Sequence, residues 1–120
     1  MSKTTGTADA QVFGIPNCDS VKKALVSLQS VGARIEFHDF KKQGVKSDLL
    51  AQWIEVFGAE RVINRKGTTW RQLDDAAKAA ADSPAGAIAL ALEKPSVIKR
   101  PVVFFQGQWT IGQTRFDGES

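Results

Sequence analysis

The chain carries a single cysteine, Cys18, where a short apolar stretch meets an amphipathic one. Residues 12–15 have the composition of a buried strand, and the residues after Cys18 that of the first turns of a helix. A thiol at the start of a helix faces unpaired backbone N–H groups and the positive end of the helix dipole. Both favour the thiolate, the reactive form of cysteine, so we predict that Cys18 is a nucleophile.

The alternative interpretation of Cys18 is an inert, small apolar residue, which is common for a lone cysteine. Its position favours reactivity, because Cys18 precedes the helical stripe and residues 16–17 make the loop before it polar and tight. Asp19 is expected to raise the pKa of the thiol, and Lys22 and Lys23, about one turn later, to offset that effect.

Three arginines are candidates for binding an anion. Arg100 precedes Pro101, so the pair is either a strand entry with a solvated arginine or a cis-proline loop that brings Arg100 to the thiol; both stay open. Arg65 lies in a polar loop before Gly67, where a solvated side chain is the simpler interpretation. Arg115, near the C-terminus, is a weaker candidate.

Other chemically versatile residues receive structural interpretations. His38 falls on the polar face of a predicted strand, and we do not assign it as a base. Trp53 and Trp70 are expected in the core.

Composition limits the possible functions. With 120 residues, 42% of them hydrophobic, the chain fits one domain with a core. Sixteen basic and thirteen acidic residues are spread along it, and no basic cluster exceeds a pair, so we expect no nucleic-acid interface. One cysteine excludes an internal disulfide and a cysteine-rich zinc site, and nothing indicates another metal. Without a membrane-length apolar run or a signal peptide, the chain is expected to be cytoplasmic, with no membrane partner.

The ends of the chain have strand character. A strand over 11–15, a helix that Asn17 caps and Gly32 ends, and a strand over 34–39 predict a parallel βαβ unit. Near the C-terminus, residues 102–105 and 108–111 flank a two-residue turn and predict a β-hairpin. This order fits an α/β fold with a four-stranded mixed sheet of the thioredoxin type.

The middle of the chain is predicted to be a helical insertion, over residues 46–93. Ser47 is expected to cap one helix, Thr69 another by capping-box spacing to Gln72, and Ser83 a third with Pro84 in its first turn. The predicted organisation is a flexible tail over 1–10 and a single domain over 11–120, with thioredoxin-like parts at 11–45 and 94–120.

Three segments resemble the ArsC/Spx/YffB family of thioredoxin-like proteins, most closely its YffB-type branch. The first, Phe13 to Ala24, carries the motif FGIPNCDSVKKA. Residues 98–103 are similar to the family's arginine and cis-proline segment, and residues 62–66 to its middle arginine segment. The resemblance covers about residues 11–112.

The resemblance implies that Cys18 is the nucleophile and that Arg65 and Arg100 bind a small oxyanion or a disulfide substrate. The family's third arginine has no secure match, and Arg115 is only a candidate for it. Lys22 and Asn17, which are close to Cys18 in the sequence, are further candidates for binding the substrate or anion. The implied activity is a glutathione-dependent thiol reductase or an arsenate reductase-like oxidoreductase, with glutathione as co-substrate and glutaredoxin as a possible partner.

Two alternatives stay open. The chain could be an Spx-like regulator that docks on RNA polymerase, although Val21 replaces the second cysteine of the C-x-x-C switch that Spx-type regulators carry. Capture of a polymerase subunit from lysate is the discriminating observation. The chain could also be a family member that has lost its chemistry, for which an ordinary Cys18 pKa would be the evidence.

Overall fold

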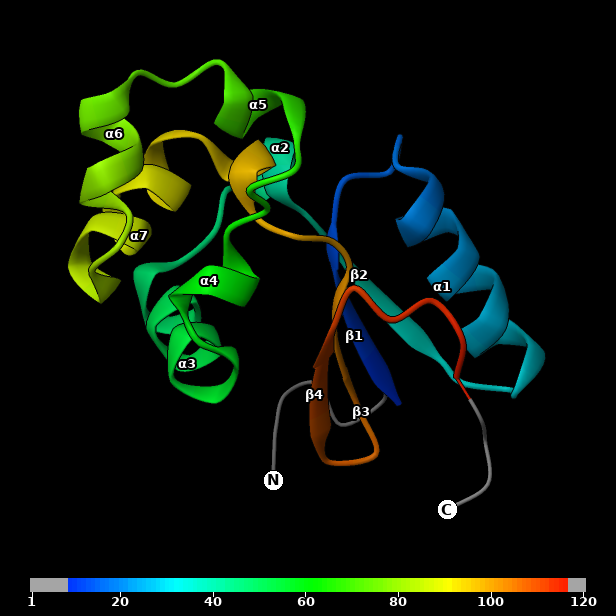
Figure 1. The fold of residues 1–120 in the computed structure, drawn as a ribbon. Coiled ribbons are helices and arrows are strands. Elements are labelled where there is room, and N and C mark those ends of the chain that lie inside the picture. The colour runs from blue at the N-terminus through cyan, green and yellow to red at the C-terminus, as the bar shows by residue number, and fades with distance from the viewer. Residues whose placement is uncertain (1–8, 117–120) are drawn as a thin grey trace. The chain divides into compact units, whose positions relative to one another are not determined.

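In the computed structural model of this protein, residues 9–116 are described, and they form two compact units. One unit comprises the chain up to Asp39 and from Arg100 onward, and the other comprises Phe40–Lys99 (Figure 1). The helical unit is longer at both ends than the predicted insertion. It includes helix α2 (Phe40–Gln43) and the 3₁₀ turn η1 (Pro95–Val97), both in segments predicted to be thioredoxin-like.

The first unit is a mixed four-stranded sheet with the order β2-β1-β3-β4, which confirms the predicted α/β fold class. Strand β1 (Ala10–Gly14) pairs in parallel with β2 (Ile35–Asp39) and antiparallel with β3 (Val102–Phe105). Strand β4 (Gln108–Ile111) forms the predicted hairpin with β3. Its turn residues have φ values of 55° and 77°, as a type I′ turn requires.

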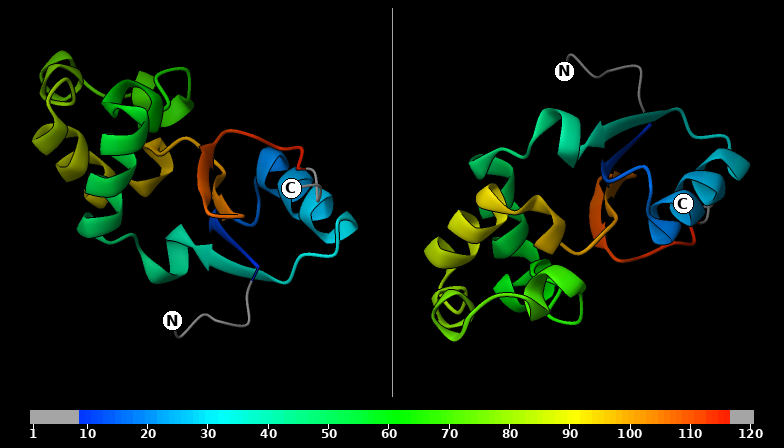
Figure 2. Two further views of the ribbon diagram at one scale, coloured as in Figure 1. Left: turned by 90° about the horizontal axis from the view of Figure 1, so that it is seen from below. Right: turned by 90° about the horizontal axis from the view of Figure 1, so that it is seen from above.

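Helix α1 (Asp19–Ser30) lies along one face of this sheet (Figure 2). Its apolar stripe is buried at Val21, Ala24 and Leu28. Val21 and Leu28 share a core cluster with Val12 of β1 and Val103 of β3. This packing fixes the start of the helix against the ends of the two central strands.

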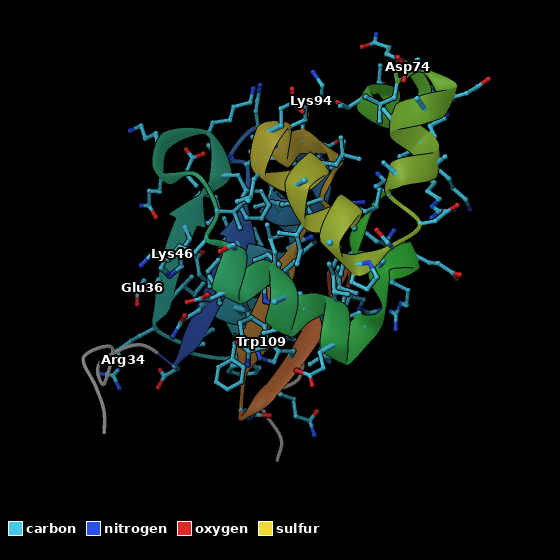
Figure 3. All side chains as sticks on the ribbon, turned by 90° about the vertical axis from the view of Figure 1, so that its left-hand side faces the viewer. Arg34, Glu36, Lys46, Asp74, Lys94 and Trp109 are labelled. Atoms are coloured by element: carbon cyan, nitrogen blue, oxygen red, sulfur yellow. The ribbon has the colours of Figure 1, made fainter. Side chains whose placement is uncertain are left out.

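The first strand begins one residue earlier than predicted, and this corrects the predicted tail. Ala10 is the first residue of β1 and is 1% exposed. The backbone N–H groups of Asp9 and Ala10 both donate to the Arg34 carbonyl, at 2.8 and 3.0 Å, and the Arg34 guanidinium contacts the Asp9 carboxylate. Arg34 lies just before β2 (Figure 3). The rest of the predicted tail, residues 1–8, is outside the described residues.

The second unit is helical. Its remaining helices are α3 (Ser47–Phe57), α4 (Ala59–Val62), α5 (Thr68–Arg71), α6 (Asp75–Ala80) and α7 (Pro84–Glu93). Trp53 and Trp70 are buried, as predicted, with exposed fractions of 0% and 9%.

The caps of these helices differ in part from the prediction. The Ser83 hydroxyl accepts from the Gly86 N–H at 3.0 Å, which confirms the predicted cap of α7. Two other predicted caps are wrong. Ser47 is the first residue of α3, after an extended Lys46, and the Thr69 hydroxyl shares a 2.9 Å hydrogen bond with Ser96 instead of capping α5. A tertiary partner has replaced the local one, and a propensity rule cannot anticipate this.

Candidate active site

Cys18 is itself the N-cap residue of α1, which corrects the prediction that Asn17 caps this helix. The extended backbone of Cys18 (φ −119°, ψ 128°) precedes the first helical residue, and its carbonyl accepts the Lys22 N–H at 2.9 Å. Asn17 lies in the exposed turn before it. With Asn17 as the cap, Cys18 would have been the first helical residue. As the N-cap itself, Cys18 directly precedes the first helical residue, Asp19.

A close approach of strand and helix sets this position. A Cβ atom at Gly14 would lie 2.7 Å from a methyl carbon of the buried Val21 side chain. The absence of a side chain at Gly14 lets α1 pack directly against the end of β1. The loop of residues 15–17 then delivers Cys18 at the carboxyl end of that strand.

Burial raises the pKa of the Cys18 thiol, but hydrogen bonds and charge more than reverse this and hold the pKa below its usual value. The opposing contributions are, in order, the backbone N–H of Val21, the Arg100 guanidinium, the backbone N–H of Ser20 and the charge of Arg100. The uncharged thiol makes no capping hydrogen bond. The N–H groups of Val21 and Ser20 favour the thiolate because a charged acceptor makes stronger hydrogen bonds than a neutral thiol.

The sheet topology explains why Arg100 meets Cys18. Strands β1 and β3 are antiparallel, and Phe13 pairs with Val102, so the end of β1 and the beginning of β3 share one edge. Arg100 lies just before β3, on the same side as the Cys18 loop. Of the two predicted interpretations of Arg100-Pro101, the structure has the cis peptide bond. The buried Pro101 also accepts the Gly112 N–H at 2.8 Å.

Residues 13–116 match the ArsC family. The chain belongs to this family. An uncharacterized protein of Haemophilus influenzae is 38% identical over 101 residues, which are 84% of this chain and 88% of that protein.

The solved structures that are similar to this ArsC-family chain include the following two. The YffB (PA3664) protein is 41% identical, with a TM-score of 0.80, over 85% of this chain and 89% of its own. An arsenate reductase (ArsC) related protein from Brucella melitensis is 36% identical, with a TM-score of 0.71, over 90% and 89% of the two chains. These similarities confirm the predicted family and its YffB-type likeness.

Arg65, the other arginine indicated by the family resemblance, lies in an exposed turn of the helical unit, as predicted, but its side chain has partners there. Its Nη2 atom donates to the Asp82 carboxylate at 3.1 Å. Its guanidinium carbon lies 5.1 Å from the centre of the Trp70 ring. The side chain stays 39% exposed and lines a basic pocket of about 250 Å³ with Arg61 and Lys66, among others. Its predicted role in anion binding stays a prediction.

Lys22 and Arg115 come together in the sheet unit. Both are exposed and line one groove of about 690 Å³ beside α1. The other residues of this groove were not predicted as site residues: Lys23, Val26, Ser27, Ser30, Thr114 and Phe116. The groove residues that belong to α1 recur at intervals of three or four positions, so the sequence could have placed them on one face of the helix.

His38 has structural surroundings. Its ring stacks on Phe13 with centroids 4.4 Å apart, and its Nε2 atom lies 3.4 Å from a Glu36 carboxylate oxygen. These contacts are consistent with the predicted structural interpretation.

The site contains no second thiol. Val21, three residues after Cys18, is fully buried in the core of the sheet unit. Within residues 9–116, no group of three or more His, Cys, Asp or Glu side chains is arranged to hold a metal ion. No helix in that range has the length and apolar character needed to cross a bilayer.

Proposed function

We propose that this ArsC-family protein is a thiol reductase that uses Cys18 as nucleophile and glutathione as the thiol that regenerates it. The observation that carries the proposal is the environment of Cys18. The helix N-terminus and Arg100 lower the pKa of this one thiol, and the chain holds no other cysteine. Such a thiol is activated for attack but cannot complete a redox cycle alone.

The reaction follows from thiol–disulfide exchange. The Cys18 thiolate attacks one sulfur of a disulfide substrate, the S–S bond breaks, and the second sulfur leaves as a thiolate that takes up a proton. Cys18 is then held in a mixed disulfide. A glutathione thiolate attacks the mixed disulfide and releases Cys18, and its own sulfur is oxidised to a disulfide. The Arg100 guanidinium stabilises the Cys18 thiolate both before attack and as the leaving group.

Arsenate is a second candidate substrate, favoured by Arg100 beside the thiol and by the arsenate reductase-related Brucella neighbour. Attack of the thiolate on arsenic(V) would form an As–S bond and release water. A glutathione thiolate would then attack the Cys18 sulfur, releasing arsenic(III) with the electron pair of the As–S bond. Glutathione or glutaredoxin would reduce the remaining mixed disulfide.

Cys18→Ser tests the proposal. Turnover of a glutathionylated peptide and of arsenate, each measured with glutathione, is expected to fall at least about 10³-fold, because removing a nucleophile removes the covalent route. Circular dichroism and a urea titration serve as the folding control. Retained turnover in the folded variant contradicts the proposal.

The pH dependence of Cys18 alkylation provides a second test. We expect the midpoint to lie below the free-cysteine value of about 8.5, and glutathione disulfide to protect the thiol by forming the mixed disulfide. An ordinary midpoint without protection would instead favour the docking or inactive interpretations.

A further inference from the structure

The groove beside α1 is the feature of the sheet unit that the proposed chemistry leaves unused. One wall is the face of α1 formed by Lys22, Lys23, Val26, Ser27 and Ser30. The other wall is the segment 114–116, which follows β4. Figure 2 shows this segment running from the end of β4 to α1.

Hydrogen bonds hold the two walls together. The Phe116 N–H donates to the Ser27 hydroxyl at 2.7 Å, and that hydroxyl donates to the Phe116 carbonyl at 3.3 Å. The Phe116 ring also packs edge-on against Phe105 of β3, with centroids 6.1 Å apart. The groove is therefore fixed to the core of its own unit.

The lining is cationic. Lys22, Lys23 and Arg115 contribute three positive charges, and no acidic residue is among the described residues of the lining. Hydroxyl groups of Ser27, Ser30 and Thr114 line the same groove, and Val26 contributes an apolar surface with 65% of it exposed. Charge and hydrogen-bonding capacity match a short peptide that carries carboxylates.

The helix geometry connects the groove with the thiol. Cys18 and Lys22 are joined by an i to i+4 backbone hydrogen bond of 2.9 Å, so Lys22 lies one turn below the thiol. From Lys22 to Ser30 the helix rises by about 12 Å. An extended tripeptide spans about 10 Å. The groove is therefore long enough for a tripeptide thiol, and its Lys22 end lies one helical turn from Cys18.

We infer that this groove binds the peptide part of the thiol co-substrate, with Lys23 and Arg115 as partners of its carboxylates. The inference rests on the proposed function, because it assumes that the regenerating thiol is a small acidic peptide. It adds a binding site separate from Arg100, the arginine beside the reacting sulfur.

Titration of the Cys18→Ser protein with S-methylglutathione tests this inference without any redox step. This probe carries both carboxylates of glutathione and no free thiol. In amide NMR spectra we expect shifts at residues 22–30 and 114–116. The double variant K23Q/R115Q is expected to raise Kd about tenfold, as for the loss of two exposed charge contacts.

The double variant K46Q/K94Q is the matched control, since it removes two exposed lysines of the helical unit (labelled in Figure 3) and the same total charge. It should leave Kd unchanged. An equal loss of affinity in both variants, equal shifts with succinate at the same ionic strength, or shifts only around Arg100 and Pro101 would overturn the inference.

The two proposals fail separately. Binding in the groove without turnover by wild-type protein contradicts the reductase function and leaves the groove as a peptide site. Turnover that depends on Cys18, with no binding in the groove, contradicts the proposed peptide site. The proposed reductase function then still holds.

Discussion

Arg100 in the sheet unit and Arg65 in the helical unit are the same residue type, and the family resemblance gave both the same role. Their contacts differ. Arg100 stabilises the Cys18 thiolate, whereas Arg65 is paired with Asp82 and stacked over Trp70. Arg100 therefore acts directly on the Cys18 thiol, whereas an anion must compete with Asp82 for Arg65. The comparison teaches that an arginine motif identifies a charge but not the partner that occupies it.

Among substitutions that separate the two arginines, Arg100→Ala has the largest expected effect. It should lower kcat/KM for the disulfide substrate by about 10- to 100-fold, because it removes a positioned cationic donor from the reacting sulfur. Arg34→Ala is the control: Arg34 is also in the sheet unit, but pairs with Asp9 at the other end of β1, about 16 Å away for five residues of strand. If both variants lose the same activity, Arg100 has no special relation to the thiol.

The pH dependence of Cys18 alkylation tests the contact between Arg100 and the thiol directly. In Arg100→Ala the midpoint of Cys18 alkylation should move up, because both the hydrogen bond and the charge that lower the thiol pKa are lost. Arg100→Lys should restore part of the shift, since lysine keeps the charge but not the planar donor geometry. An unchanged midpoint in Arg100→Ala would contradict the contact.

The free energy of unfolding should also depend on the ionisation of Cys18. Because the folded protein holds the Cys18 pKa below the unfolded value of about 8.5, the ionised thiol stabilises the fold fully above that pH. This stabilisation is lost as the pH falls through the lowered pKa. Wild-type protein should therefore gain stability relative to Cys18→Ser as the pH rises through this window, which urea titrations at several pH values can measure.

Arg65→Ala should have a smaller effect. Loss of the contact with Trp70 and of the exposed ion pair is expected to lower the free energy of unfolding by about 1 kcal/mol. If Arg65 also binds the substrate anion, as the family resemblance implies, KM rises by about threefold to tenfold while kcat changes little. Urea denaturation and steady-state kinetics measure the two effects. A loss of kcat as large as that of Arg100→Ala would remove the distinction between the two arginines.

The smallest expected effect is that of Asp82→Asn. Its carboxylate side chain is 71% exposed, so the pair with Arg65 should contribute no more than about 0.5 kcal/mol to stability. A double-mutant cycle with Arg65→Ala measures this coupling directly. A coupling energy well above that figure would mean that the pair is a structural anchor and that Arg65 is not free to bind substrate.

Local signals were enough for much of the fold. The hairpin turn at Gln106-Gly107, the Ser83 cap and the buried stripe of α1 each depend on neighbours within a few residues. The sequence therefore predicted them correctly. The predicted caps at Asn17, Ser47 and Thr69 were wrong because several residues in a row could serve, and packing made the choice. For Thr69, the choice was a hydroxyl 27 positions away, on Ser96.

The sequence by itself determined that the one cysteine lies between a strand and a helix. This position predicts Cys18 as the nucleophile, because the adjacent helix N-terminus favours the thiolate. It also determined that the chain has no second cysteine, so a reductase of the proposed kind would need an external thiol. Only the tertiary structure decided which arginine lies beside Cys18. The antiparallel pairing of β1 and β3 brings Arg100 to Cys18 across more than eighty residues of chain. The packing of segment 114–116 on α1 likewise forms a basic groove from residues that are distant in sequence. Such long-range pairings depend on the whole core, and no local pattern encodes them.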